Sequence, residues 1–520
     1  MVKIIFTGFF LLNSQGNLSS GAFICPWDYD KIGYLNYISL LIMPFLSIEA
    51  VVYFILLFPI YWALKKQPAY QNNFLLFSGL IVLAYINIWF ALVLVVFSLL
   101  ITALSIQISK SKERMRKLWF AVSLCAVGGN LAVFKYFDFF RPMLQSIFSK
   151  SDLIDVLLPL GLSYYSFQSI TYLVSVYKQE NIKLEWNELL LYFSFFPTIT
   201  AGPIARVNSF QTILGKQEGM ASQIKTKEQR QVIRPVLALS LILLGVTKKW
   251  WFSSWIANEI VDPVFENPMQ YDAFTVLSSI YGYTAQLYFD FSGYSEMVIG
   301  LAMLLGFSLP FNFYMPLASH NIREFWNRWH ISLSTWIRDY IYIPLGGSRH
   351  GFFRTQMNLL IAMILSGIWH GYGWNFFVWG ALHGSALVLL NCGDRIFGGK
   401  NKFSQNWLTK TFSMLITLTF VSGAFVVFRV ESINDALLIF ESLFSNEAKE
   451  VYPTLYTVMF LMLFISFVLL NGILYQMLFK FINVMERANI IFLAFVFIFI
   501  MLVVIIFSPS GIPGFIYANF

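Results

Sequence analysis

Apolar residues form a series of long runs that short polar segments separate along almost the entire chain. Several runs reach the roughly 20 residues that an α-helix needs to cross a bilayer. This pattern predicts an all-α protein, a polytopic transmembrane helical bundle. The runs lie at 46–64, 73–87, 88–108, 118–134, 153–177, 188–205, 236–252, 273–289, 292–309, 329–345, 356–369, 372–391, 411–428, 454–478 and 488–507.

Basic residues gather in four of the polar segments, and lysine and arginine favour the cytoplasmic side of a membrane. Residues 429–451 instead carry a net charge of −3 and suit the outer side. The basic segments are 109–117 and 206–234, each with a net charge of +4, 346–355 with two arginines, and 393–410 with a net charge of +3.

One apolar run conflicts with simple alternation of crossings. If 188–205 crossed fully, the basic segment 206–234 would face outward. The run contains Pro197, Gly202 and Pro203, which interrupt a helix. Irregular backbone persists at membrane depth only where it packs in protein or lines a wet cavity. We therefore predict that 188–205 is a re-entrant segment that returns to the cytoplasmic side.

Composition excludes a soluble enzyme. Hydrophobic residues make up 58% of the chain and charged residues 12%, and the mean hydropathy is +0.67. A soluble domain carries about 25% charged residues. The net charge of +8 lies in short tracts between apolar runs, so it indicates membrane topology and no nucleic-acid partner.

The N-terminal 42 residues differ from the rest of the chain. Residues 1–42 begin like a signal peptide, with Lys3 before an apolar stretch, but no convincing cleavage site follows. A complete first helix already begins at Met43. We expect 1–42 to be an N-terminal extension and 43–520 to be a single membrane-embedded domain.

All five histidines lie between positions 320 and 383, close to a polar block at 321–351 that interleaves charged residues with tryptophans. An arginine, lysine or aspartate at the centre of a membrane helix costs at least ~2.5–3.5 kcal/mol. The block therefore faces a protein interior, a water-filled cavity or the interface. An interfacial amphipathic helix with tryptophan anchors and no catalytic role is an equally good interpretation of this block alone.

His370 lies between two apolar runs and is followed by Gly371 and Gly373, which permit unusual backbone angles. Histidine exchanges protons near neutral pH, which is what activating a hydroxyl nucleophile requires. The alternative is a buried structural histidine that is hydrogen-bonded to a carbonyl. Two histidines in neighbouring polar and aromatic motifs favour the functional interpretation.

Asp290 and Glu296 lie in apolar surroundings within 286–300. A buried acid can orient an imidazole or hold an arginine. It can also be a polar contact between helices, and we prefer that interpretation for Glu296.

Several kinds of site find little support in the sequence. The histidines lack i,i+4 pairing, the three cysteines are widely separated, and no H-E-x-x-H motif occurs, so we expect no metal. A P-loop and a G-x-S-x-G elbow are also absent from the sequence.

The strings FWNRWHISLSTWIRDYIYIPLGG and GIWHGYGWNFFVWGALHG resemble the signature of the membrane-bound O-acyltransferase family. The likeness is to its bacterial polysaccharide branch, which acetylates alginate or peptidoglycan. It extends from about Met43 to the C-terminus, and supporting stretches lie at 158–178, 195–206 and 289–307.

The resemblance implies roles for individual residues. His370 matches the family's catalytic histidine, and His330 matches a second characteristic position that is often asparagine in eukaryotic relatives. The implied fold is a ring of tilted helices with two funnels that meet at the histidine. Residues that we expect to line or support the substrate tunnel are Trp329, Ser332, Ser334, Trp336, Arg338, Asp339, Trp369, Asn375, Asp290 and Gln168.

The implied activity is transfer of an acetyl group from a cytoplasmic donor, acetyl-CoA, across the bacterial inner membrane to an extracytoplasmic polysaccharide. Peptidoglycan is favoured as the acceptor. No bound cofactor is expected, and a periplasmic acetyltransferase is the expected partner protein. The alternatives are acetylation of alginate or cellulose, D-alanyl transfer to teichoic acid, a transporter without transferase chemistry, and a structural scaffold.

Overall fold

The computed structural model describes residues 48–137, 139, 141, 158–371, 373–398, 406–445 and 455–509. The proposed N-terminal extension 1–42 lies outside these residues, so its status and the single domain 43–520 stay predictions. Within the described part, nine helices are long and apolar enough to cross a membrane. The predicted all-α, polytopic architecture is confirmed, and the chain is an integral membrane protein.

Nearly every element is a helix, and the only sheet among the described residues pairs β1 (Phe210–Gln211) with β2 (Gln217–Glu218). Three π-helical stretches interrupt the α-helices, at Thr247–Ser253, Ala257–Val261 and Arg338–Tyr342. The α-helices are α2 (Ile48–Ala63), α3 (Pro68–Ile86), α4 (Ile88–Lys110), α5 (Glu113–Lys135), α7 (Leu162–Tyr177), α8 (Trp186–Ser194), α9 (Met220–Ile224), α10 (Pro235–Val246), α11 (Ser254–Ile256), α12 (Asp262–Glu266), α13 (Ala273–Leu304), α14 (Ile322–Arg328), α15 (Ile331–Ile337), α16 (Gly351–His370), α17 (Trp374–Ile396), α18 (Trp407–Arg429), α19 (Ile433–Ser442), α20 (Leu455–Met485) and α21 (Ile490–Phe507).

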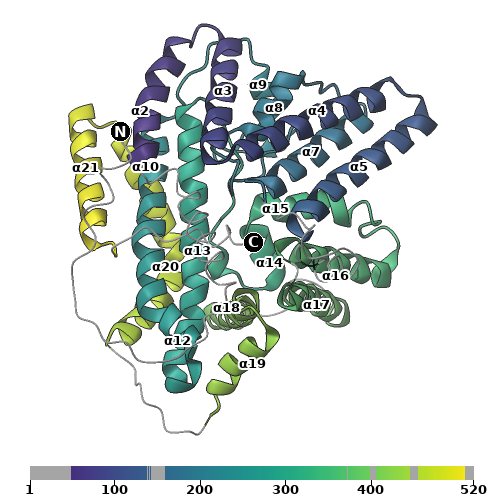
Figure 1. Ribbon diagram of the computed structural model, residues 1–520. Coiled ribbons are helices and arrows are strands. Elements are labelled where there is room, and N and C mark those ends of the chain that lie inside the picture. Colours follow the sequence, from purple (N-terminus) through teal and green to yellow (C-terminus); the bar gives the residue numbers. More distant parts are fainter. Residues whose placement is uncertain are drawn as a thin grey trace, which may run out of the picture.

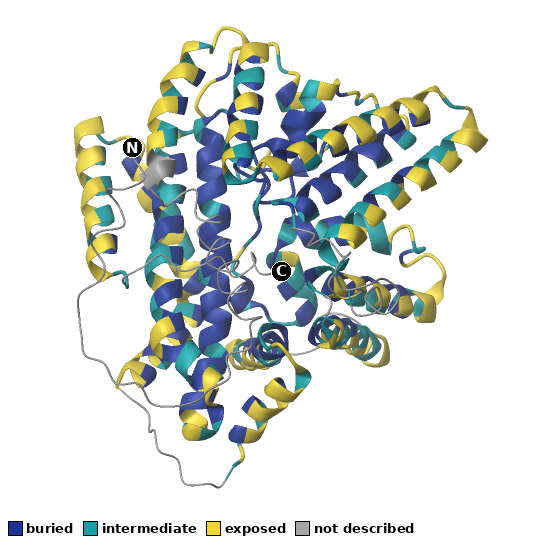
Figure 2. Ribbon diagram, in the orientation of Figure 1, coloured by how far each residue is buried: buried dark blue, intermediate teal, exposed yellow. Residues whose placement is uncertain are grey.

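Helix α13 is the central element. Figure 1 shows it upright beside α10 and α20, while α4, α5 and α7 slant away and α17 and α18 are seen nearly end-on. It is buried over most of its length (Figure 2). A Cβ added at Gly293 would lie 2.7 Å from the carbonyl oxygen of Gly245 in α10. The two helices therefore pack backbone against backbone, as small residues allow in membranes.

The structure corrects two predicted boundaries. The runs 273–289 and 292–309, which Asp290 and Phe291 separate, fall in one continuous helix, α13, because the Asp290 carboxylate pairs with Lys249 and does not break the helix. The run 329–345 is instead divided into α15 and the π-helical stretch Arg338–Tyr342. The residue before α15, His330, has a φ of +43°. These short pieces do not have the length of a membrane span.

The segment that we predicted to be re-entrant does not form a spanning helix. Helix α8 has nine residues and is about 14 Å long, less than half of the ~30 Å hydrocarbon core. The irregular chain that follows is buried, and the backbone N–H of Ile204 donates to Ser332 Oγ at 3.0 Å. The return of this segment to the cytoplasmic side stays a prediction.

The segments 206–234, 346–355 and 393–410 are predicted to be cytoplasmic, and we call the side of the membrane that they are expected to face the basic face. Among the described residues, Arg395 lies 4.5 Å from the ring centroid of Phe352, so the second and third segments meet there. Ion pairs and hydrogen bonds connect the basic segments and nearby residues to neighbouring helices. They join Asn72 to the Ile224 carbonyl, Lys225 to Glu188, Arg206 to Asp339, Arg234 to Glu486 and Arg323 to Asp394. Arg429, at the start of the acidic segment 429–451, pairs with Asp262 at 2.7 Å. The side of the membrane on which each segment lies stays a prediction.

Candidate functional site

His370 is the last residue of α16, at the turn between two antiparallel helices. Helix α16 packs closely on α17 because Gly367 and Gly380 lack side chains: an added Cβ would meet the Phe376 carbonyl oxygen at 2.2 Å and the Met363 carbonyl oxygen at 2.5 Å. The backbone becomes extended at Gly371, which ends the helix. The sequence thus places an imidazole at a helix end that close packing fixes.

Aromatic rings surround the His370 imidazole. The ring centroids of Trp369, Phe428 and Trp379 lie 4.6, 4.9 and 5.3 Å from it, and all three contacts are edge-on. The histidine is 2% exposed. A substrate would reach it only through a passage, and the two funnels implied by the family resemblance stay a prediction.

The end of α5 holds the turn that carries His370. The last carbonyl groups of a helix have no partner within the helix. Lys135 Nζ donates to the carbonyl oxygen of Trp369, and the Tyr136 hydroxyl donates to that of Ile368 at 2.9 Å. The lysine ammonium also lies 5.0 Å from the centroid of the Trp369 ring. Helix α5 therefore contributes both an anchor and a positive charge beside the imidazole.

His330 is the residue before α15 and adopts a left-handed backbone conformation. Asn312 fixes this turn, since its carbonyl accepts from the Ile331 N–H at 2.9 Å and its side-chain oxygen accepts from Ser332 Oγ at 2.6 Å. The His330 ring lies edge-on to Phe291 at 4.7 Å. Burial lowers the pKa of His330 to about 3, so its imidazole is neutral at physiological pH.

Two of the predicted tunnel residues meet near His370 through one phenylalanine. The Phe167 ring on α7 lies 4.3 Å from Trp336 and 5.0 Å from Trp369. Gln168, the next residue on α7, is buried. Trp329 stacks on Phe325, at 5.4 Å between ring centroids. These residues form the aromatic frame between the α14–α15 segment and the α16 turn.

Other predicted residues hold the scaffold. Ser332 supports the backbone at Ile204, as described above, and Ser334 Oγ donates to the Trp329 carbonyl at 3.0 Å. Asn375 Nδ2 donates to the Val430 carbonyl at 2.8 Å, which joins the start of α17 to the end of α18.

Three predicted residues with charged side chains lie in ion pairs. Asp339 accepts hydrogen bonds from Arg206 at 2.6 Å and from its neighbour Arg338 at 2.7 Å. Burial would raise the pKa of Asp339, but the two guanidinium groups lower it below its usual value. Asp290 forms a fully buried ion pair with Lys249. Each of these three side chains thus forms an ion pair.

The sequence interpretation missed Lys135, Tyr136 and Lys249. Each lysine lies inside or at the end of an apolar run, where an ionisable side chain usually has a specific partner. That signal was present, but the partners are 234 and 41 residues away along the chain. No local pattern identifies them.

The arrangement suits proton transfer in a site that excludes water. One imidazole lies at a fixed helix end, a second neutral imidazole stands in the adjoining segment, and a lysine lies beside the first. Among the described residues, no cluster of three or more histidine, cysteine, aspartate or glutamate side chains suits a metal ion. A buried imidazole of this kind has the chemistry of a general base.

Comparison with known proteins adds a family and several relatives. The model of the membrane-bound O-acyltransferase family matches residues 131–397, which include both histidines. The chain is 30% identical over 433 residues to the peptidoglycan O-acetyltransferase of Helicobacter pylori, covering 78% of each protein. It is 34% identical over 345 residues to the probable alginate O-acetylase of Pseudomonas aeruginosa, covering 65% of this chain and 61% of that protein. It is 28% identical over 288 residues to the teichoic acid D-alanyltransferase of Streptococcus thermophilus, covering 52% of this chain and 68% of that protein.

Proposed function

The chain belongs to the membrane-bound O-acyltransferase family and is an acyltransferase, and we propose that it transfers acetyl groups across the membrane for the O-acetylation of peptidoglycan. The support for this acceptor is the similarity to the Helicobacter pylori enzyme, which covers 78% of both chains. The bacterial sources of the similar proteins favour the inner membrane as its location.

The observation that carries the proposal is the fixed position of His370 at the α16 turn, beside a neutral His330 and a lysine. In the proposed reaction, His370 accepts the proton of an acceptor hydroxyl. The oxygen forms an ester bond with the acetyl carbon, the carbon–sulfur bond of the thioester breaks, and the departing sulfur takes the proton. His370 is then ready for a second cycle.

Acetyl-CoA is the proposed donor. Its phosphate groups are anionic, and the segments 206–234, 346–355 and 393–410, which we predict to be cytoplasmic, are positively charged. A concentrated positive field attracts anionic ligands. We also propose a periplasmic acetyltransferase as the partner, which receives the acetyl group and modifies the glycan.

Ester-linked acetate released from purified cell walls by mild base tests this function. In a strain that carries the His370→Ala variant, we expect acetate to fall by at least about 100-fold, since general-base catalysis contributes 10²–10⁴. His383→Asn is the matched control, because His383 is equally buried in the same hairpin and packs against aromatic rings. Membrane levels of each variant are compared by immunoblot.

Two outcomes would contradict the proposal. Unchanged acetate in the His370→Ala strain removes this histidine from the reaction. An equal loss in both strains, at normal membrane levels, indicates that the hairpin's packing and not the imidazole at 370 is what activity requires.

Alginate is the second candidate acceptor. The identity to the alginate protein, 34%, is higher, although it extends over less of the chain. The D-alanyl alternative has lower identity and coverage. Analysis of the ester-linked groups separates the three, because alginate acetate is found in the exopolysaccharide, peptidoglycan acetate in the wall, and D-alanine on teichoic acid.

A further inference from the structure

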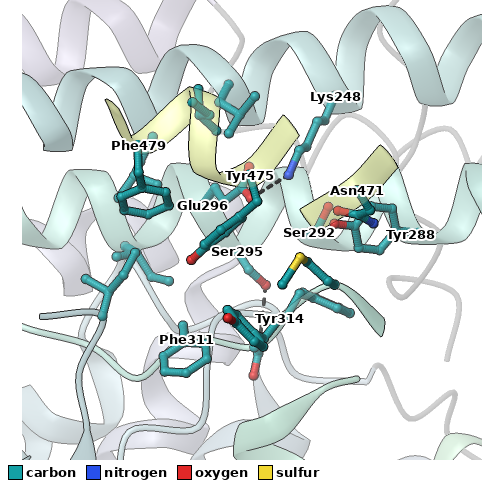
Figure 3. Close-up of a pocket in the computed structure, with 18 of the residues that line it drawn as sticks. Lys248, Tyr288, Ser292, Ser295, Glu296, Phe311, Tyr314, Asn471, Tyr475 and Phe479 are labelled. Atoms are coloured by element: carbon teal, nitrogen blue, oxygen red, sulfur yellow. Dashed lines mark hydrogen bonds and ion pairs between the residues drawn. The ribbon is translucent and has the colours of Figure 1, made fainter. Parts of the chain in front are cut away.

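A pocket of about 450 Å³ lies between α10, α13 and α20, away from His370. Figure 3 shows side chains from all sides converging on it. Its volume falls within the range of small-molecule sites, roughly 300–1,000 Å³. Helices α10 and α13 lie within the family match, whereas α20 lies beyond it. One wall of this pocket is thus supplied by a helix outside the family's common region.

The pocket is mainly aromatic and aliphatic. Helix α20 contributes one face, from Phe467 to Ile482. Its other side exposes large apolar residues, including Ile473 at 58% and Met477 at 61%, as a helix against lipid tails does. A single helix therefore separates the pocket from the bilayer.

A few polar groups lie within this apolar lining. The π-helical stretch after α10 carries Lys248, whose ammonium pairs with Glu296 of α13 at 2.5 Å (Figure 3). Such π-helical stretches are rare in proteins, and those that do occur often lie at functional sites. Glu296 Oε2 and Asn471 Nδ2 have no hydrogen-bond partner among the described residues, and Asn471 is 5% exposed. The site thus offers an acceptor and donors that a ligand can use.

The length of α20 indicates how deep the pocket lies. Helix α20 is long and apolar enough to cross a membrane, and its 31 residues span about 46 Å. Centred on a ~30 Å hydrocarbon core, it extends about 8 Å beyond each side, which puts Asn471, about 21 Å before its last residue, about 13 Å inside the boundary. Glu486, just beyond that end, pairs with Arg234 of the basic segment 206–234. The pocket therefore reaches the lipid tails of the leaflet on the basic face.

We propose that this pocket binds one glycerophospholipid of the leaflet on the basic face. One acyl chain lies along the aromatic lining, and the ester carbonyls accept hydrogen bonds from Lys248 and Asn471. The lining's one lysine is already neutralised by Glu296, which disfavours the phosphates of coenzyme A and suits the neutral ester region of a lipid. The bound lipid fastens α20 to the core.

Native mass spectrometry of the full chain in detergent, with added palmitoyl-oleoyl-phosphatidylethanolamine, tests the proposal. We expect the wild type to retain one lipid. Leu474→Trp, which fills the pocket, should lower lipid occupancy by at least about tenfold, a difference of ~1.4 kcal/mol. Leu470→Trp is the matched control, because Leu470 is similarly exposed on α20 but does not line the pocket. Equal retention by the wild type and both variants would overturn the proposal.

A second measurement uses the unaltered protein. A phosphatidylethanolamine with a photoreactive group on its acyl chain should label the pocket side of α20, at Phe467 or Leu474, and leave Ile473 and Met477 at the level of bulk lipid contact. Uniform labelling around α20 would contradict a specific site. Displacement of the lipid by acetyl-CoA would assign the pocket to the donor and overturn the proposal, while leaving the proposed acetyltransferase function intact.

Discussion

Two regions of this protein hold ionisable side chains at membrane depth, and each compensates them differently. Beside α13, each of two consecutive lysines meets a carboxylate: Lys248 pairs with Glu296 and Lys249 with Asp290. At the α16 turn, Lys135 instead contacts a backbone carbonyl and the face of an aromatic ring. The first region cancels charge within itself, and the second places a positive charge beside an imidazole.

The difference separates structural from functional use of buried charge. A buried ion pair leaves little net field and mainly fixes how two helices pack. A lysine held by a carbonyl acts, whenever it is protonated, on the neighbouring imidazole and on any anionic group that reaches it. The comparison predicts large stability effects beside α13 and activity effects at the α16 turn.

The largest effect is expected from Lys249→Met, which leaves Asp290 as a buried acid without this lysine. Removing one partner of a buried pair costs about 3–5 kcal/mol. We expect a lower unfolding temperature of the detergent-solubilised protein, measured by tryptophan fluorescence. The double variant Lys249→Met and Asp290→Leu should regain most of the loss. If the single variant were as stable as the wild type, the pair would not be the structural element described here.

A smaller effect, on catalysis alone, is expected from Lys135→Met. Loss of the anchor and of the positive charge at the α16 turn should lower kcat by about tenfold, a barrier increase of ~1.4 kcal/mol, with KM for the donor unchanged. Lys135→Arg should restore part of the rate, because it restores the charge. Acetyl transfer by the purified protein provides the measurement.

Tyr136→Phe is the matched control for Lys135. It removes the adjacent hydrogen bond to the Ile368 carbonyl and leaves the charge in place. Equal losses of kcat in Lys135→Met and Tyr136→Phe would show that both residues act only as anchors.

The smallest effect is expected outside the spanning helices, from Asp339→Asn. This substitution weakens contacts to Arg206 and Arg338, and pairs of this kind contribute about 0–1 kcal/mol. Because the folded-state pKa of Asp339 is lowered, its contribution is present above the ordinary carboxyl pKa of about 4 and is lost as the pH falls further. Unfolding temperatures of the wild type and the variant should therefore differ slightly at pH 7 and converge as the pH falls below the ordinary carboxyl range. A difference that grows toward low pH would contradict this assignment.

The sequence predicted helices well where apolar residues are continuous. The runs 88–108, 411–428 and 488–507 correspond to α4, α18 and α21 within a few residues. It placed a break at Asp290 and Phe291, where α13 is continuous, since a charged residue between apolar stretches indicates either the end of a helix or a buried ion pair, and the partner Lys249 lies in another element. The ambiguity is resolved only by tertiary packing.

The sequence indicates His370 as the central residue of the candidate site but not the residues that hold its turn in place. The glycines after position 370 mark the end of α16, and a histidine at that end is visible from the sequence. Lys135 and Tyr136 become neighbours of this turn only through the fold, because their bonds go to backbone carbonyls, which carry no residue-specific signal. Arg338 was predicted to line or support the substrate tunnel, and in the structure its guanidinium group pairs with the adjacent Asp339.

The left-handed backbone at position 330 restricts which amino acids can occupy it. Asparagine, aspartate and histidine are the side-chain-bearing residues that tolerate a positive φ, whereas β-branched residues are strained there. An exchange of His330 for asparagine therefore preserves the turn into α15, and an exchange for valine would distort it before any effect on chemistry. The backbone conformation thus restricts position 330 to a few amino acids whose side chains form hydrogen bonds. The chemistry of the site then decides which of these amino acids is suitable.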